Sequence, residues 1–184
     1  FSEVGASVQL ASLRYTQATA GDVTIAAGQT LGIDGTIIVA PTVESNGPSI
    51  TGGSITGTRG GGQLGIQQNS TGNFIIGSQI VDNTGVIGFT KAGDGLVTLT
   101  NADNSYTGAT VISAGTLAVA SIKDGGVNSA IGASSADPGK LVIQGATLQY
   151  TGGDTTSDRG FTIARSGAIV DNTIAVTEAD TNLT

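Results

Sequence analysis

The residues of this chain that could perform acid–base chemistry are its fourteen carboxylates. Enzymes that cleave polysaccharides group two such carboxylates on one face, with Arg, Lys or His nearby to move the proton. Here nearly all the acids stand in turn contexts such as Asp34-Gly35 and Asp94-Gly95, where a side-chain oxygen accepts a backbone hydrogen bond. We therefore predict that the acids build turns and that the chain has no catalytic residue.

The densest group of charges is formed by Asp154, Asp158 and Arg159. Two carboxylates beside a guanidinium could take part in acid–base chemistry, but a group this close in sequence is typical of charges that pair across a loop. We expect a loop ion pair at this place.

Other catalytic and metal-binding chemistries lack their residues. With no cysteine and no histidine, the chain has no thiolate ligand, no disulfide and no histidine base for a serine nucleophile. Neither the EF-hand spacing nor the glycine–aspartate nonapeptide of calcium-loaded β-rolls occurs. A glycine run at 60–62 follows Arg59, but no helix pattern opens after it to complete a phosphate site. We predict no metal and no cofactor.

The charge balance excludes a nucleic-acid partner. The net charge is −7, and the seven basic residues are scattered singly along the chain, whereas binding to phosphates needs clustered Lys and Arg. No apolar run approaches the roughly 20 residues that a membrane-spanning helix requires. We expect an acidic chain without a membrane span of its own.

The element that must position these side chains is the short β-strand. In 88–120, apolar residues alternate with polar ones in three short runs, separated by Gly, Asn and Asp clusters. A period of two with β-branched residues and such punctuation predicts strands joined by tight turns. The aromatic side chains are expected to stack inside, rather than to form an exposed binding patch; they are Tyr15, Phe74, Phe89, Tyr106, Tyr150 and Phe161.

The strand pairs repeat at intervals near 20 residues. Ile163 follows Ile143 by 20 positions and Ile169 follows Leu148 by 21. The interval from Ile112 to Ile143 is 31, which is the same unit enlarged by a loop. An earlier group, 25–31, shows the same plan of apolar residue, glycine corner and apolar residue. A repeat with insertions confined to loops predicts an all-β solenoid, which we expect to hold eight or nine coils of about three strands each.

The stretch 88–120 resembles the autotransporter-associated β-strand repeat, also called the passenger-associated transport repeat, of Gram-negative autotransporters. It departs slightly at Leu96 and Val97, where family members mostly carry Thr or Leu. The residues that carry the likeness and build the repeat are Gly93, Gly95, Val97, Leu99, Tyr106, Thr107, Gly108, Ile112, Ala114, Gly115, Thr116, Leu117 and Val119.

This resemblance implies a right-handed parallel β-helix, with 1–184 as one β-solenoid segment of a longer passenger domain. It further implies exposure on the bacterial cell surface or secretion, with a C-terminal β-barrel translocator in the full-length protein. A non-catalytic structural or adhesive role follows, with host cell-surface or extracellular-matrix components, or further copies of the chain, as partners. The alternative function is that of a carbohydrate-active β-solenoid, a polysaccharide lyase or hydrolase.

One irregular segment, 123–139, is the candidate ligand-facing loop. It carries the polar residues Asn128, Ser129, Ser134 and Ser135, with Val127 and Ile131 as anchors onto the rod. Two hypotheses stay open: a packed loop that shields the coil edge, and part of an adhesive face. If the loop is peripheral, replacing 126–137 by a Gly-Ser linker leaves the melting temperature nearly unchanged.

Overall fold

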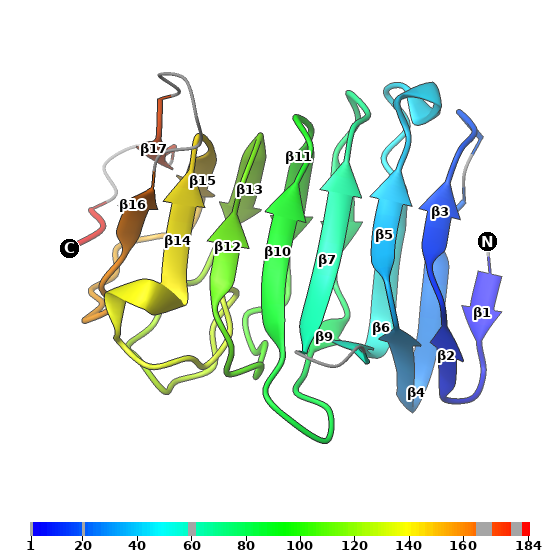
Figure 1. Ribbon diagram of the computed structural model, residues 1–184, viewed down its shortest axis with the longest axis horizontal. Coiled ribbons are helices and arrows are strands. Elements are labelled where there is room, and N and C mark those ends of the chain that lie inside the picture. The colour runs from blue at the N-terminus through cyan, green and yellow to red at the C-terminus, as the bar shows by residue number, and fades with distance from the viewer. Residues whose placement is uncertain (1, 20, 59–61, 165–170, 178–181) are drawn as a thin grey trace.

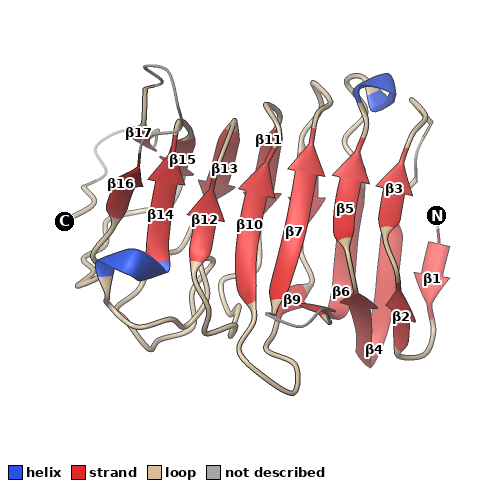
Figure 2. Cartoon of the chain, viewed as in Figure 1, coloured by secondary structure: helices blue, strands red, loops and turns tan. Residues whose placement is uncertain are grey.

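The computed structural model describes residues 2–19, 21–58, 62–164, 171–177 and 182–184. The chain forms a rod of stacked coils with its two ends at opposite ends of the rod (Figure 1). Apart from two single-turn 3-10 helices, η1 (Pro41–Val43) and η2 (Pro138–Lys140), its described elements are strands (Figure 2). The predicted all-β class is confirmed.

Two parallel sheets face each other across the rod. The ten-stranded sheet has the order β1-β4-β6-β8-β11-β13-β15-β17, with β2 and β9 paired to β4 and β6. Its strands are β1 (Ser2–Val4), β2 (Val8–Leu10), β4 (Val23–Ile33), β6 (Ser49–Gly57), β8 (Phe74–Ile76), β9 (Gln79–Ile80), β11 (Leu96–Leu99), β13 (Thr116–Val119), β15 (Thr147–Tyr150) and β17 (Thr173–Val176).

The second sheet has seven strands in the order β16-β14-β12-β10-β7-β5-β3, one strand from each coil. They are β3 (Leu13–Tyr15), β5 (Thr36–Val39), β7 (Gln63–Gln68), β10 (Gly88–Ala92), β12 (Thr110–Ile112), β14 (Leu141–Gln144) and β16 (Thr162–Ala164). Over the described residues the rod thus has about seven coils, fewer than the expected eight or nine. From β10 onward each coil gives one strand to each sheet among the described elements, so an extra strand in the ten-stranded sheet is described only in the coils up to β9.

The hand of the solenoid can be followed in Figure 1. The strands of the seven-stranded sheet lie in front and run upward, while the chain advances from the right toward the left. This path is a right-handed coil, as the family resemblance implies and as parallel strand crossovers almost always are.

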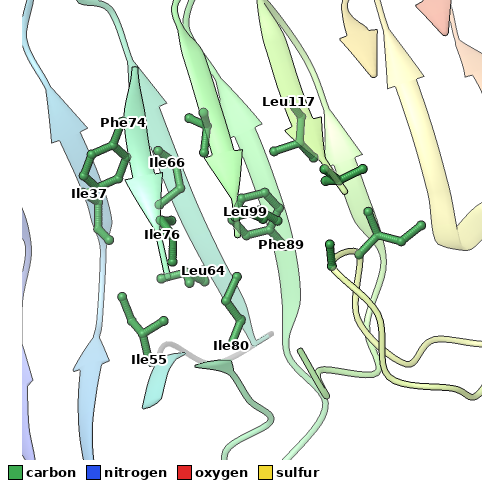
Figure 3. Packing of buried hydrophobic residues seen from close by; sticks show 14 of the residues in the cluster. Ile37, Ile55, Leu64, Ile66, Phe74, Ile76, Ile80, Phe89, Leu99 and Leu117 are labelled. Atoms are coloured by element: carbon green, nitrogen blue, oxygen red, sulfur yellow. The ribbon is translucent and has the colours of Figure 1, made fainter. Parts of the chain in front are cut away.

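The core is a set of ladders of like residues between the sheets (Figure 3). In the ten-stranded sheet Val97 pairs with Leu117 and Leu117 with Leu148, and all three side chains are at most 1% exposed. The alternation of buried and outward positions along each strand therefore matches the period-two pattern of the sequence.

No described helix is long and apolar enough to cross a membrane.

The coil length varies because insertions leave the ladders intact. Thr110 pairs with Phe89, 21 positions earlier, and with Leu141, 31 positions later. Leu148 pairs with Ile174, 26 positions on, so the predicted 21-residue step to Ile169 is wrong; Ile169 itself lies outside the described residues.

The parallel drawn between 25–31 and the later corners is also wrong. Ile25 and Leu31 both belong to β4, in the same sheet, whereas Ile112 and Leu117 lie in opposite sheets. Gly28 has φ +74 and sits where the β4–β6 register shifts between Ile25 and Thr30. A left-handed glycine serves a bulge within a strand as well as a corner between strands, so the two have the same sequence pattern.

Candidate functional site

The repeat residues predicted from the sequence all lie inside the rod or at its corners. The five larger aliphatic members are 0–1% exposed and belong to strands of the two sheets: Val97, Leu99, Ile112, Leu117 and Val119. The glycines stand where coils meet most closely. A Cβ atom added at Gly95 would lie 2.5 Å from the carbonyl oxygen of Ser70, and one at Gly108 would lie 2.5 Å from that of Ile87.

Two of these glycines stack on each other at one corner of the rod. Gly93 has φ +77 and Gly115 has φ +63, a region that side chains rarely adopt. A Cβ atom at Gly115 would come within 2.5 Å of the carbonyl oxygen of Gly93. These two positions of the repeat therefore need glycine both for the turn and for the close stacking of coils.

Tyr106 is the large residue around which the repeat joins the 123–139 loop. Its side chain is fully buried, and its hydroxyl lies 2.7 Å from the Thr110 hydroxyl. Its carbonyl oxygen accepts a hydrogen bond of 2.8 Å from the backbone N–H of Ala133. Burial raises the pKa of the Tyr106 phenol, so the group stays neutral and shares a hydrogen bond with the Thr110 hydroxyl.

Five of the six aromatic residues are buried inside the rod. Those predicted to stack inside are at most 6% exposed, with the exception of Phe161 at 49%. Tyr15 contacts Phe74 with ring centroids 5.5 Å apart, and Phe89 contacts Tyr106 at 6.2 Å. The prediction of internal stacking is confirmed for the other five and is wrong for Phe161, which precedes β16 and is exposed.

The 123–139 loop is folded against the rod rather than projecting from it. Ala130 and Ile131 are 1% exposed and belong to the main core cluster. The predicted anchor Ile131 is therefore confirmed, whereas Val127 is 46% exposed and anchors nothing. The loop backbone is held by hydrogen bonds from Ala130 to Ser121 and from Gly126 to Ser134.

The four polar residues proposed to face a ligand are split by this packing. Ser129 and Ser134 are 0% and 1% exposed, so these two cannot contact a ligand. The Ser129 hydroxyl donates to the Gly132 carbonyl at 2.9 Å, and the Ser134 hydroxyl accepts from Arg159. Asn128 is half-buried and Ser135 is exposed; only these two could still meet a ligand.

Arg159, from the next coil, holds the loop together by hydrogen bonds from its guanidinium to several loop residues. We call this residue the clasp of the loop. Its Nε donates to the carbonyl oxygen of Lys123 at 2.7 Å, and one terminal nitrogen donates to the Ser134 hydroxyl at 2.8 Å. The other terminal nitrogen reaches the carbonyl oxygens of Val127 at 3.2 Å and Gly132 at 2.8 Å. Burial lowers the pKa of Arg159, against the opposing effect of neighbouring groups that include Asp158 and Asp124.

The charged cluster at 154–159 is thus not the ion pair that the sequence suggested. The hydrogen bonds of the Arg159 guanidinium go to backbone carbonyls and one hydroxyl. Asp158 accepts from the Gly125 N–H at 2.7 Å, and Asp154 accepts from the Asn182 N–H at 2.8 Å. A planar guanidinium with five donors can bind several carbonyls at once, which explains how one residue orders a whole loop.

Several other carboxylates accept backbone N–H groups, as the interpretation of turn chemistry predicts. Asp22 accepts from Ser49 at 2.8 Å, and Asp137 accepts from Gly139 at 2.7 Å. No group of three or more His, Cys, Asp or Glu side chains that could hold a metal ion occurs within the described ranges. The carboxylates that form these bonds have a structural use within the rod.

Lys91 is a buried residue that the sequence interpretation missed. It pairs with Ile66 on one side and Ile112 on the other, so it occupies one rung of an isoleucine ladder at 0% exposure. Its Nζ donates to the carbonyl oxygens of Gly93 and, at 2.9 Å, Ala114. Burial lowers the pKa of Lys91 to about 8, with Asp94 acting in the opposite direction. The only hint in the sequence was its inward position in the alternation of β10.

The comparisons with known proteins agree with this architecture. Residues 89–119 match the family model of the passenger-associated transport repeat. Over 183 residues, 100% of this chain, the sequence is 51% identical to the adhesin BmaC autotransporter of Brucella suis biovar 1 (strain 1330). The chain spans about 5% of the length of that relative. No solved structure matches the chain significantly. The chain therefore contains the repeat of autotransporter passengers and is similar over its full length to one segment of an autotransporter adhesin.

Proposed function

We propose that this chain is a non-catalytic, adhesive segment of the passenger of a Gram-negative autotransporter, displayed on the cell surface or released from it. The observation that carries the proposal is the 51% identity along the whole chain to a protein named an adhesin. A repeat named for passenger-associated transport lies at the centre of the chain. Candidate partners are host cell-surface components, extracellular-matrix components and further copies of the chain.

The physical properties of the rod support this role. Each coil contacts its neighbours through parallel strands in two sheets, so the segment can add length to a passenger without a separate domain core. The core is built from aliphatic and aromatic side chains, and the carboxylates described above accept backbone hydrogen bonds. Such a rod suits the presentation of a surface at a distance from the membrane.

The proposal can be tested with the purified chain and with the chain displayed on a non-adherent bacterium. We expect binding to cultured epithelial cells, or to immobilised fibronectin, collagen or laminin, above that of an unfolded control. Leu117→Asp provides this control because it places an unpaired charge in the buried ladder. Binding no stronger than that of the control on all these surfaces would contradict an adhesive role.

The non-catalytic part of the proposal has its own assay. The purified chain is incubated with pectin, polygalacturonate and other acidic glycans, and new reducing ends and unsaturated products are measured. We expect no turnover above a boiled sample. Cleavage that scales with the concentration of the folded chain would overturn this part and favour the carbohydrate-active alternative.

A further inference from the structure

A hollow on the described surface lies over the first coils of the rod. It has a volume of about 530 Å³ and is lined from both sides by polar residues of β2, β4, β6 and the segment after β9. These strands lie next to one another at the N-terminal end of the rod in Figure 1. The hollow is within the roughly 300–1,000 Å³ that small-molecule sites occupy.

The register of the sheet explains why a groove forms here. Gln9 pairs with Gly32, and Gly32 pairs with Thr56, so one outward row runs across three coils. Gly32 has no side chain, and the side chains of Thr58 and Gln9 pack over it, 2.7 and 3.1 Å from where a Cβ atom would stand. One wall is therefore the first coil, and the other is the segment 81–84.

The wall formed by 81–84 is held rigidly in place. One carboxylate oxygen of Asp82 accepts the backbone N–H groups of Ile87 at 2.7 Å and Thr107 at 3.0 Å. The other oxygen accepts the Thr107 hydroxyl at 2.7 Å, and Thr56 donates to the carbonyl of Val81 at 2.8 Å. The groove is thus formed before any ligand binds, which lowers the entropic cost of binding.

Four side chains of the groove keep their hydrogen-bonding capacity unused. The side chains of Gln9, Thr30, Thr58 and Thr84 line the hollow and make no hydrogen bond to another described residue. They offer hydroxyl and amide groups that can both donate and accept. The 123–139 loop offers two such side chains, those of Asn128 and Ser135, whereas the groove places four along one hollow.

The charge of the lining selects the class of ligand. Among the residues that the structure describes, no Lys or Arg lines the groove, so this part of the lining offers an anionic ligand no counter-charge. The single carboxylate, Asp82, already accepts three hydrogen bonds, so a basic peptide would gain little. Val8, 40% exposed, and Val81 add small apolar surfaces between the polar groups. A sugar ring, with hydroxyls at its edge and C–H groups on its faces, matches this mixture.

We propose that the groove formed by 7–9, 30–32, 56–58 and 81–84 binds a short stretch of uncharged glycan. The proposal rests on the adhesive function proposed above, for which it names the class of ligand. Binding would be weak at one site, and many copies of the passenger on one cell would strengthen attachment through multivalency.

The direct test is a titration of the nitrogen-15-labelled chain followed by NMR. The probes are the uncharged lacto-N-neotetraose, maltotetraose and chitotetraose at millimolar concentration, with a heparin tetrasaccharide as the anionic comparison. We expect at least one uncharged probe to shift the amide signals of Gln9, Thr30, Thr58 and Thr84. No shift with any uncharged probe, or shifts with the heparin fragment alone, would overturn the proposal.

Substitutions locate the binding to the groove. The double variant Thr30→Val and Thr58→Val keeps the side-chain shape but removes two hydroxyls, and should weaken binding about tenfold. Thr36→Val, on the other sheet, is the matched control and should bind as the wild type does. Unchanged affinity of a folded double variant would refute the site. If the double variant is unfolded, Gln9→Leu at the exposed β2 position takes its place and must weaken binding.

Adhesion is measured separately so that the two proposals fail in different ways. If the displayed wild type adheres and the folded double variant adheres equally well, the groove proposal fails and the adhesive function stands. If the wild type does not adhere, the adhesive function fails, whatever the titration shows. Loss of adhesion together with loss of glycan binding in the double variant would support both.

Discussion

The sequence predicts that the irregular 123–139 loop presents polar side chains to a ligand. The structure instead buries two of its serines and forms a polar groove at the N-terminal end of the rod. The loop is the irregular part of the chain, yet Ser129 and Ser134 are buried and bound within the fold. The groove combines positions of β2, β4 and β6 with the irregular segment 81–84, and it leaves the polar side chains of Gln9, Thr30, Thr58 and Thr84 without partners among the described residues. In the loop, polar side chains such as that of Ser129 satisfy backbone groups that no strand ladder pairs.

This difference separates two uses of polar residues in a solenoid. In the loop, hydroxyls and the Arg159 guanidinium replace the missing strand ladder and satisfy backbone carbonyls. In the groove, the strand ladder already satisfies the backbone, so outward side chains remain free. The free polar groups of the groove lie both on strand faces, as at Gln9 and Thr30, and just outside strands, as at Thr58 and Thr84.

The largest expected effect is that of removing the loop. Replacing 126–137 by a Gly-Ser linker deletes the buried Ala130 and Ile131 and uncovers Tyr106. We expect a loss of roughly 4 kcal/mol in the free energy of unfolding, measured by denaturant titration. This replaces the prediction of an unchanged melting temperature, which assumed a peripheral loop. Val127→Ser at the exposed tip is the control and should change stability by no more than about 0.5 kcal/mol.

The next largest effect on stability is expected from removing the hydrogen bonds of the clasp residue, Arg159. Arg159→Met keeps the apolar stem but removes the donors to Lys123, Gly132 and Ser134, and should cost about 2–3 kcal/mol. Arg159→Lys keeps the charge without the planar fork and should recover only part of this loss. Arg14→Met, at an exposed position of β3, should have little effect. Equal stability of the Arg159 and Arg14 variants would show that the loop does not need its clasp.

Two glycines of the loop share a positive φ but differ in their contact with Tyr106. Replacing each by Ala gives a smaller effect that tests this contact directly. Gly126 and Gly132 have φ +81 and +77, so Ala at either position meets the same backbone strain. Only at Gly132 would the new Cβ atom also lie 2.6 Å from the carbonyl oxygen and 2.8 Å from the ring of Tyr106. Thermal unfolding should find Gly132→Ala about 1–2 kcal/mol less stable than Gly126→Ala. Equal losses would mean that the loop does not pack on Tyr106.

The smallest effect concerns Lys91 and the pH dependence of stability. Its folded pKa of about 8 lies below the ordinary 10.5, so between these values the unfolded chain binds a proton that the folded chain has lost. The free energy of unfolding should therefore rise from pH 8 to pH 10, by about 1–2 kcal/mol. Above pH 10 the trend should reverse, because burial raises the pKa of Tyr15 and Tyr106.

Two variants assign this rise to its residue. Lys91→Met should flatten the curve between pH 8 and pH 10, since the titrating group is gone. Lys123→Met, at an exposed position, should leave the rise in place. A rise of the same size in Lys91→Met would assign the pH dependence to another group.

Much of the fold could be predicted because the period-two pattern acts within each strand. The ladders through Ile112 and Ile143, and through Leu117 and Leu148, follow from alternation and like-with-like stacking. The step from Leu148 to Ile174 could not be predicted in this way, because a loop insertion changes the interval without changing the pattern. The sequence pattern places Gly28 at a corner between strands, whereas it lies at a bulge within β4. Corners and bulges both use a glycine with positive φ, so the pattern is the same for the two.

The candidate site was less predictable because it depends on contacts between coils. The burial of Ser134 is decided by Arg159, 25 positions later in the chain. The groove is produced by Gln9, Gly32 and Thr56 lying side by side, and nothing in their local sequences shows this. Lys91 looked like a scattered surface charge until the register placed it between Ile66 and Ile112.

Hydrogen exchange of the native chain tests the central claim, that the 123–139 loop is part of the folded rod. The amides of Ala130 and Ala133 donate to Ser121 and Tyr106, so we predict that they exchange as slowly as the amides of β12. The amide of Val86, a residue that is 60% exposed, serves as the fast internal reference. Exchange of the Ala130 and Ala133 amides at the rate of Val86 would contradict the account.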